Sequence, residues 1–111
     1  MLIYKILRAD EWADLQVIGQ TAGAPIDVAD GYIHFSTAEQ AAETAAKHFT
    51  DVEGLELLAY NIEILGQDLE WEASRGDDLF PHLYAPLRRS QMSWHVPLPL
   101  VDGVHQFPAD L

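Results

Sequence analysis

The chain lacks cysteine altogether, and this absence removes several kinds of site at once. Without thiols it can form no disulfide framework, no thiolate nucleophile and no cysteine-ligated zinc site. It also has no apolar run near the ~18 residues that suggest a membrane-spanning helix. We therefore expect a soluble cytoplasmic protein without a membrane partner.

Basic residues are also scarce. Six Lys and Arg residues stand against 18 Asp and Glu residues, which gives a formal net charge of -12 with neutral histidines. Nucleic-acid-binding proteins usually carry a basic stripe that displaces counterions from phosphates, so DNA and RNA are disfavoured as partners. A small anionic ligand is still compatible with this charge, because local donors such as Arg75, Arg88 and Arg89 act at short range.

The rest of the composition is that of an ordinary globular domain. Hydrophobic residues make up 49% of the 111 residues and charged residues 22%, unlike a disordered chain. No internal repeat, low-complexity segment or Gly/Ser linker divides the sequence. We expect one domain over residues 1–111, with a single modest core.

Short apolar segments punctuated by Gly, Pro and Asp residues predict a series of strands. The expected strands are residues 2–7, 32–36, 55–64, 69–72 and 92–96. Pro97 and Pro99 should stop the last of them, because proline has no N–H for a sheet ladder. Residues 20–30 hold Gly23 and Pro25 among small side chains, which predicts a loop.

A first helix is predicted directly after the first strand. Asp10 is a suitable N-cap, and acidic residues favour the positive end of a helix. Trp12, Leu15 and Ile18 follow at spacings that would form one buried stripe. Gly19 should end this helix, because glycine readily adopts the left-handed conformation of a helix C-terminus.

A second helix has the clearest local pattern in the chain. Thr37 and Gln40 have the spacing of a capping box. Small apolar residues then recur on one predicted face, namely Ala38, Ala41, Ala42, Ala45 and Phe49. Such a face lets the helix axis approach a sheet closely, while Glu39, Glu43 and Lys47 face water.

The strand before this helix carries the first group of candidate site residues. If Ile33 and Phe35 face the core, Tyr32, His34 and Ser36 share the opposite face. The hydroxyls of Ser36 and Thr37 would then lie beside the free N–H groups of a helix N-terminus, which favours a ligand site. The alternative is that Ser36 and Thr37 only cap the helix and that His34 is a structural histidine.

A second group lies in residues 79–87, which we expect to be extended but not a long regular strand. Pro81 and Pro86 bracket His82 and Tyr84, whose rings would project to one side of an extended segment. Such a ring pair can hydrogen-bond hydroxyls and stack on a flat heterocycle. The alternative is a loop held to the core by Phe80 and Leu83, with His82 bonded to a carbonyl.

Acidic and metal-binding candidates are fewer. Glu70 and Glu72 flank Trp71, and Glu72 is the better candidate acid because it is nearer Arg75. The alternative is that both glutamates are simply solvated. The five histidines show no pair at metal-ligand spacing, so no metal site is expected. No Gly-rich phosphate loop, nucleophile elbow or dinucleotide fingerprint is present.

Two segments resemble a known bacterial family. Residues 30–40 (DGYIHFSTAEQ) and 80–87 (FPHLYAPL) look like the family termed "domain of unknown function 952". Residues 3–6 and 71–72 are also similar, so the resemblance runs through nearly the whole chain.

Members of that family resemble the ADP-ribosyltransferase fold, an α+β fold with a split antiparallel β-structure and flanking helices that grips NAD. The resemblance implies that Tyr4, His34, Ser36 and Tyr84 hold nicotinamide and ribose. It also implies that Glu72 is the acid near the reacting glycosidic carbon.

These patterns lead to two hypotheses about function. The first is an ADP-ribosyltransferase-like domain that binds NAD or a related nucleotide and transfers or removes an ADP-ribosyl group. The second is a non-catalytic ligand-binding or protein-interaction module. The first predicts that His34 and His82 meet at one cavity, whereas the second predicts that they do not.

Overall fold

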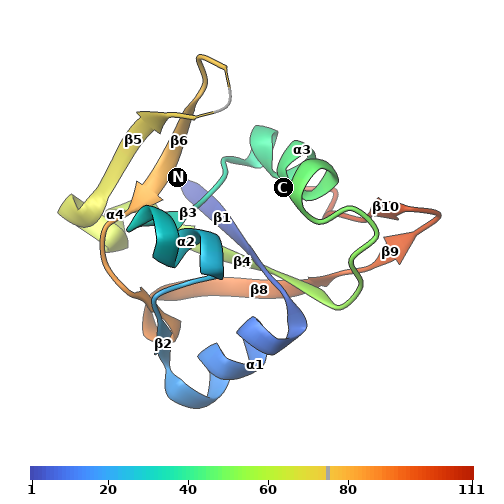
Figure 1. The fold of residues 1–111 in the computed structure, drawn as a ribbon, viewed down its shortest axis with the longest axis horizontal. Coiled ribbons are helices and arrows are strands. Elements are labelled where there is room, and N and C mark those ends of the chain that lie inside the picture. Colours follow the sequence, from blue (N-terminus) through green and yellow to red (C-terminus); the bar gives the residue numbers. More distant parts are fainter. Residues whose placement is uncertain (75) are drawn as a thin grey trace.

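A three-stranded antiparallel sheet in the order β1-β4-β8 forms the centre of the structure (Figure 1). Its strands are β1 (Leu2–Leu7), β4 (Leu55–Asn61) and β8 (Met92–Leu98). The structure is a computed structural model that describes residues 1–74 and 76–111. Arg75, one of the cations considered above for an anionic ligand, lies outside the described residues.

Two helices cover opposite faces of this sheet. Ile3 and Leu7 of β1 pack in a cluster with Leu15 of α1 (Ala9–Ile18). The alternate residues of β1 pack in a second cluster with Ala45 of α3 (Ala38–His48). The two-residue periodicity of a strand therefore divides the apolar side chains between two cores.

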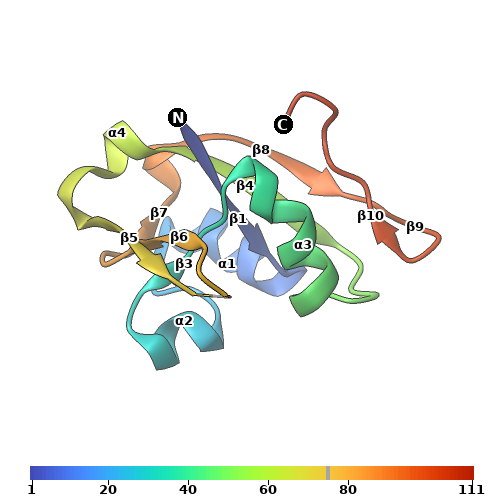
Figure 2. The same ribbon diagram turned by 90° about the horizontal axis from the view of Figure 1, so that it is seen from above.

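A second antiparallel sheet, in the order β3-β6-β5, lies beside the first (Figure 2). Its strands are β3 (Ile33–His34), β6 (Leu79–Leu83) and β5 (Leu69–Ala73). A bridge connects the two sheets, because Tyr4 and Ser36 exchange backbone hydrogen bonds of 2.8 and 2.9 Å. β1 thus belongs to the central sheet along one edge and contacts the second sheet along the other.

Short elements complete the fold. Two small antiparallel pairs join β2 (Gln20–Thr21) to β7 (Leu87–Arg88) and β9 (Leu100–Val101) to β10 (Val104–His105). The short helices are α2 (Pro25–Asp30) and α4 (Ile62–Leu65), with 3-10 turns at Gly66–Asp68 and Arg89–Gln91. Within the described residues, no helix is long and apolar enough to cross a membrane.

The strongest local patterns predicted their elements correctly. The first strand is residues 2–7 as expected, and Gly19 ends α1 with a φ of 90°. Thr37 caps α3 through its side chain, and the backbone N–H of Thr37 donates to Gln40 Oε1 at 3.0 Å. Mixed helices and antiparallel sheets confirm the α+β class.

The expected loop at residues 20–30 was wrong, because this segment contains β2 and the helix α2. Pro25 stands at the first helical position, where its missing N–H costs nothing. Asp27 Oδ2 accepts a hydrogen bond of 2.8 Å from the Ala24 N–H, and Gly31 ends the helix at a φ of 84°. These helix signals were present but were outweighed by the loop-forming residues around them.

Several boundaries also differ from the predictions. α1 begins after Arg8 rather than at Asp10, because Glu11 Oε1 accepts from the Arg8 N–H at 2.9 Å. β4 ends at Asn61, whose Oδ1 accepts from the N–H of Glu63 and starts α4. β8 continues through Pro97, because β8 lies at a sheet edge where a missing N–H is tolerated.

Two burial predictions and one strand prediction fail. Ile18 is exposed at the last turn of α1, and Ala42 is exposed on α3. The predicted strand 32–36 divides between two sheets: Ile33–His34 pairs with β6, whereas Ser36 bonds to β1. This change of partner brings the polar face of the segment to the junction of the sheets.

Candidate functional site

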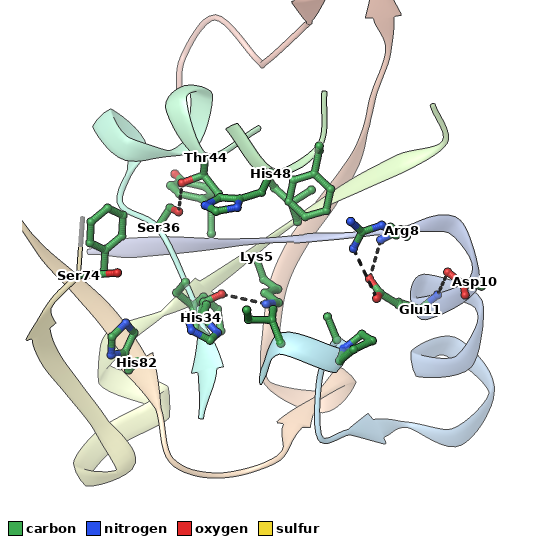
Figure 3. A pocket seen from close by; sticks show the side chains of 18 residues that line it. Lys5, Arg8, Asp10, Glu11, His34, Ser36, Thr44, His48, Ser74 and His82 are labelled. Carbon is green, nitrogen blue, oxygen red and sulfur yellow. Dashed lines mark hydrogen bonds and ion pairs between the residues drawn. The ribbon is translucent and has the colours of Figure 1, made fainter. Parts of the chain in front are cut away.

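A cavity of about 540 Å³ lies at the junction of the two sheets, beside α3 (Figure 3). The free edge of β1 supplies one wall through Tyr4, Lys5 and Ile6, and Arg8 follows at the end of that strand. The remaining polar wall residues come from five other segments and are Asp10, Glu11, His34, Ser36, Thr44, His48, Ser74 and His82. Residues distant in sequence therefore converge on one space.

The cavity occupies the part of the β1 edge that no strand of the described residues covers. Tyr4 uses its backbone N–H and C=O to bond Ser36. In an antiparallel strand, alternate residues point their backbone groups to the same edge, so Ile6 points its N–H and C=O the same way. Ile6 lines the cavity, and this edge can therefore offer one backbone donor and one acceptor to a ligand.

His34 is held at the cavity wall by two carboxylates. Its Nδ1 lies 2.6 Å from Asp27 Oδ1, and its Nε2 lies 2.9 Å from Asp30 Oδ2. α2 supplies both carboxylates, and the backbone N–H of His34 also donates to Asp27 at 2.9 Å. His34 thus has a fixed orientation, and both of its ring nitrogens already have protein partners.

Asp27 is the buried centre of this arrangement. Its carboxylate accepts from the Lys5 ammonium at 2.8 Å, and the exposed fraction of the Asp27 side chain is 0%. Lys5 also donates to the backbone carbonyl of His34 at 3.0 Å. Burial alone raises the pKa of Asp27, but the hydrogen bond from His34 and the Lys5 charge outweigh it and lower that pKa to about 2.

Two hydroxyls meet on the α3 side of the cavity. Ser36 Oγ and Thr44 Oγ1 lie 2.9 Å apart, and both residues line the cavity. Ser36 is fixed by its bridge to Tyr4 of β1, whereas Thr44 lies within α3, more than one turn after the start of the helix. Thr37, between them in sequence, uses its hydroxyl to accept from the Gln40 N–H at 3.3 Å, so it caps the helix.

His82 lies opposite His34 in the β3–β6 pair and contributes to the same cavity. Its Nδ1 is 2.8 Å from Glu72 Oε1 on β5. Its Nε2 is buried and has no hydrogen-bond partner among the described residues. An unpaired polar atom away from water costs roughly 1–3 kcal/mol, so this nitrogen calls for an explanation.

Glu72 holds two side chains rather than facing the cavity. Its Oε1 also accepts a hydrogen bond of 2.7 Å from the Tyr84 hydroxyl. The bonds from Tyr84 and His82 lower the pKa of Glu72, and Glu72 in turn raises the pKa of Tyr84 to about 12. As predicted, the His82 and Tyr84 rings project to one side, where they share this carboxylate oxygen.

Tyr32 connects the two candidate groups. Its ring stacks on His82 with a centroid distance of 4.1 Å and contacts His34 at 4.6 Å. Tyr32 and Tyr84 line a second cavity of about 360 Å³, which is mostly apolar. These two tyrosines therefore line the second cavity and not the main one.

The main cavity is less acidic than the rest of the molecule. Two of the six Lys and Arg residues line it, Lys5 and Arg8, against two of the 18 acidic residues, Asp10 and Glu11. Three of the five histidines line it as well, and Arg8 lies over the ring of Phe49 at 4.7 Å. The wall can therefore accommodate an anionic group that the overall charge would repel.

The structure thus brings together four of the predicted ligand-binding or catalytic residues at one cavity: Tyr4, His34, Ser36 and His82. Tyr32 and Tyr84 face the second cavity, Glu72 lies behind His82, and Thr37 caps α3. The sequence analysis missed Asp27, Lys5 and Thr44. Asp27 was missed because its segment was predicted to be a loop. Lys5 stands within an apolar strand, and this position indicated that the lysine has a buried ionic partner.

Among the described residues, no group of three or more His, Asp or Glu side chains is placed to hold a metal ion.

Comparison with known proteins places this site in a family. The model described as "Protein of unknown function (DUF952)" matches residues 6–95. The chain belongs to this family. The DUF952 match includes both segments that carry His34 and His82, and of the residues that line the cavity only Tyr4 and Lys5 lie outside it. No curated protein matches the chain.

Solved structures agree with the family assignment. The chain is similar to protein CC0527 from Caulobacter crescentus, whose crystal structure has 51% sequence identity and a TM-score of 0.91. That match covers 96% of this chain and 94% of CC0527. The solution NMR structure of CC0527 gives 52% identity and a TM-score of 0.85, covering 95% and 91% of the two chains. The DUF952 fold described above is therefore shared with CC0527.

Proposed function

We propose that the main cavity binds NAD or a related nucleotide containing ADP-ribose. The observation that carries this proposal is the convergence of His34 and His82, whose ring centroids lie 5.4 Å apart at one cavity. Convergence of these two segments at one cavity is what a ligand site built from both would require. It supports a small-molecule site, because convergent polar groups in a largely apolar pocket are typical of such sites.

The size and chemistry of the wall suit a nucleotide. A volume of about 540 Å³ lies within the range of small-molecule pockets, roughly 300–1,000 Å³. The edge of β1 at Ile6 offers a donor and an acceptor to a carboxamide or a base. The Ser36 and Thr44 hydroxyls suit ribose, and Arg8 suits a phosphate.

ADP-ribosyl transfer or removal is the reaction class that this proposal includes, and it rests on the resemblance to the ADP-ribosyltransferase fold. In this proposal Glu72 acts through His82, because its carboxylate holds the imidazole and does not line the cavity. His34 shapes the wall through its ring, because both of its nitrogens are bonded to Asp27 and Asp30.

Isothermal titration with NAD and with ADP-ribose tests the proposal. The wild-type protein should release or absorb heat on binding, and His82→Ala should weaken the affinity at least tenfold. His95→Ala is the matched control, because His95 bonds Glu56 on the central sheet and does not line the cavity. Absence of heat from every nucleotide at millimolar concentration would overturn the proposal.

Incubation with NAD separates the two functional hypotheses once binding is established. Mass spectrometry should detect free nicotinamide if the domain transfers the ADP-ribosyl group of NAD to water or to another acceptor, because nicotinamide is the leaving group of that reaction. Tight binding without nicotinamide release would instead identify a non-catalytic ligand-binding module. This second function is favoured by the two carboxylates that bond both ring nitrogens of His34.

A further inference from the structure

One buried nitrogen is left unexplained by the contacts within the protein. His82 is 2% exposed, and its Nε2 has no hydrogen-bond partner among the described residues. The other ring that faces it, His34, differs in this respect, because both nitrogens of His34 have carboxylate partners. The missing partner therefore concerns one specific buried atom of a residue that lines the cavity.

The contact with Glu72 determines which ring nitrogen of His82 carries the hydrogen. The Glu72 carboxylate only accepts hydrogen bonds, so the 2.8 Å contact places a hydrogen on Nδ1 of His82. In a neutral imidazole the other nitrogen, Nε2, then carries the lone pair. The Tyr84 hydroxyl donates to the same Glu72 oxygen at 2.7 Å and keeps the carboxylate in place.

Packing keeps the ring in this orientation. Tyr32 stacks on the His82 ring at 4.1 Å with an interplanar angle of 18°. The His82 backbone is paired with β3 on one side and β5 on the other. A buried acceptor in a fixed orientation is suited to one donor, and the cavity that His82 borders is the space from which that donor can come.

We propose that Nε2 of His82 accepts a hydrogen bond from a neutral hydroxyl of the bound ligand, with Glu72 and Tyr84 as positioning residues. The proposal rests on the proposed function, because it assigns the ligand group that this cavity selects. It excludes an anionic oxygen at this position, because an anionic oxygen has no hydrogen to donate. Neighbouring side chains close Nε2 to solvent, so ligand binding should also move side chains around His82.

NMR of the histidine ring nitrogens tests the tautomer without any ligand. In the wild-type protein, at a pH where the imidazole is neutral, His82 should carry its hydrogen on Nδ1 and none on Nε2. Glu72→Ala should abolish this preference, whereas Glu70→Ala, two residues away on the same strand, should leave it unchanged. A hydrogen on Nε2 in the wild-type protein would overturn the proposal.

Addition of D-ribose and of ADP-ribose to the same sample tests the ligand contact. Either compound should shift the Nε2 resonance of His82 in the wild-type protein, and Glu72→Ala should reduce the affinity about tenfold. A response to D-ribose without binding of ADP-ribose would sink the proposed nucleotide function but support the hydroxyl contact. No response of Nε2 to either compound would overturn the contact itself.

Discussion

His34 and His82 occupy directly opposed positions of an antiparallel strand pair, and their rings meet edge to face with centroids 5.4 Å apart. The two imidazoles nevertheless have different surroundings. Asp27 and Asp30 engage both nitrogens of His34, whereas Glu72 engages only Nδ1 of His82. One ring is therefore part of the scaffold, and the other has a buried nitrogen without a partner among the described residues.

Acid should weaken the fold through Asp27. The pKa of this carboxyl is lowered from 3.8 to about 2, so its stabilising effect is complete above pH 4. Below pH 4 the unfolded chain takes up a proton before the folded one does, so about 2 kcal/mol of stability is lost as the pH falls from 4 to 2. Urea unfolding over this pH range measures the loss.

Asp27→Asn should be more damaging than acid alone. The substitution leaves the buried Lys5 ammonium without a charged partner, which typically costs about 3–5 kcal/mol of unfolding free energy. Asp14→Asn, at an exposed position of α1, should change it by no more than about 0.5 kcal/mol. Equal stability of the two variants in urea would contradict the role given to the Asp27–Lys5 pair.

Glu72→Gln should lower the pKa of Tyr84 from about 12 toward its ordinary value of 10.0. The negative charge of Glu72 and its hydrogen bond both oppose ionisation of the phenol, and the amide removes the charge. Carbon-13 NMR of labelled tyrosine rings follows Tyr84 separately during an alkaline titration. Glu70→Gln is the matched control, and an equally large shift in that variant would argue against a specific contact.

Ala45→Leu should destabilise the protein by about 1–3 kcal/mol. Ala45 is 1% exposed where α3 packs on the central sheet, so a larger side chain forces the helix away from β1. Ala42→Leu lies on the exposed side of the same helix and should change stability by less than about 0.5 kcal/mol. Thermal unfolding of the pair measures the difference, and similar melting temperatures would disprove the close approach.

Gly23→Ala should destabilise the protein for two reasons, namely backbone strain and a close contact of the added Cβ with Asp27. Gly23 has a φ of 101°, and an added Cβ would lie 2.4 Å from Asp27 Oδ2. Gly31 also has a positive φ, but nothing lies within 4 Å of its added Cβ. Gly31→Ala should therefore cost only the conformational strain, about 1–2 kcal/mol, and Gly23→Ala clearly more. Chemical denaturation compares them, and equal losses would exclude the contact.

Local sequence patterns predicted those parts of the fold that local energetics decide. The capping box at Thr37 and Gln40 and the glycine stop at Gly19 need only neighbours within one turn, and both predictions were confirmed. The helix at Pro25–Asp30 was missed although Pro25 and Gly31 are local helix signals, because the loop-forming residues around them outweighed these signals. The bond of Asp27 to Lys5, 22 residues earlier, adds stability that local patterns do not specify.

The candidate site was predictable in outline but not in its connections. Alternation along residues 32–36 placed His34 and Ser36 on one face, and the prolines around His82 predicted a rigid segment. The meeting of these segments required the β3–β6 register, which depends on long-range pairing. For the same reason the roles of Glu72 and Tyr84 as partners of one oxygen became visible only in the structure.

The bridge between Tyr4 and Ser36 has a consequence for folding. The cavity wall draws on residues from Tyr4 to His82, so the wall is complete only after the most distant strand pairs have closed. A compound that occupies the cavity consequently binds the fully assembled chain and not a partly ordered one. Occupancy should therefore slow global unfolding and protect amides of both sheets from hydrogen exchange together.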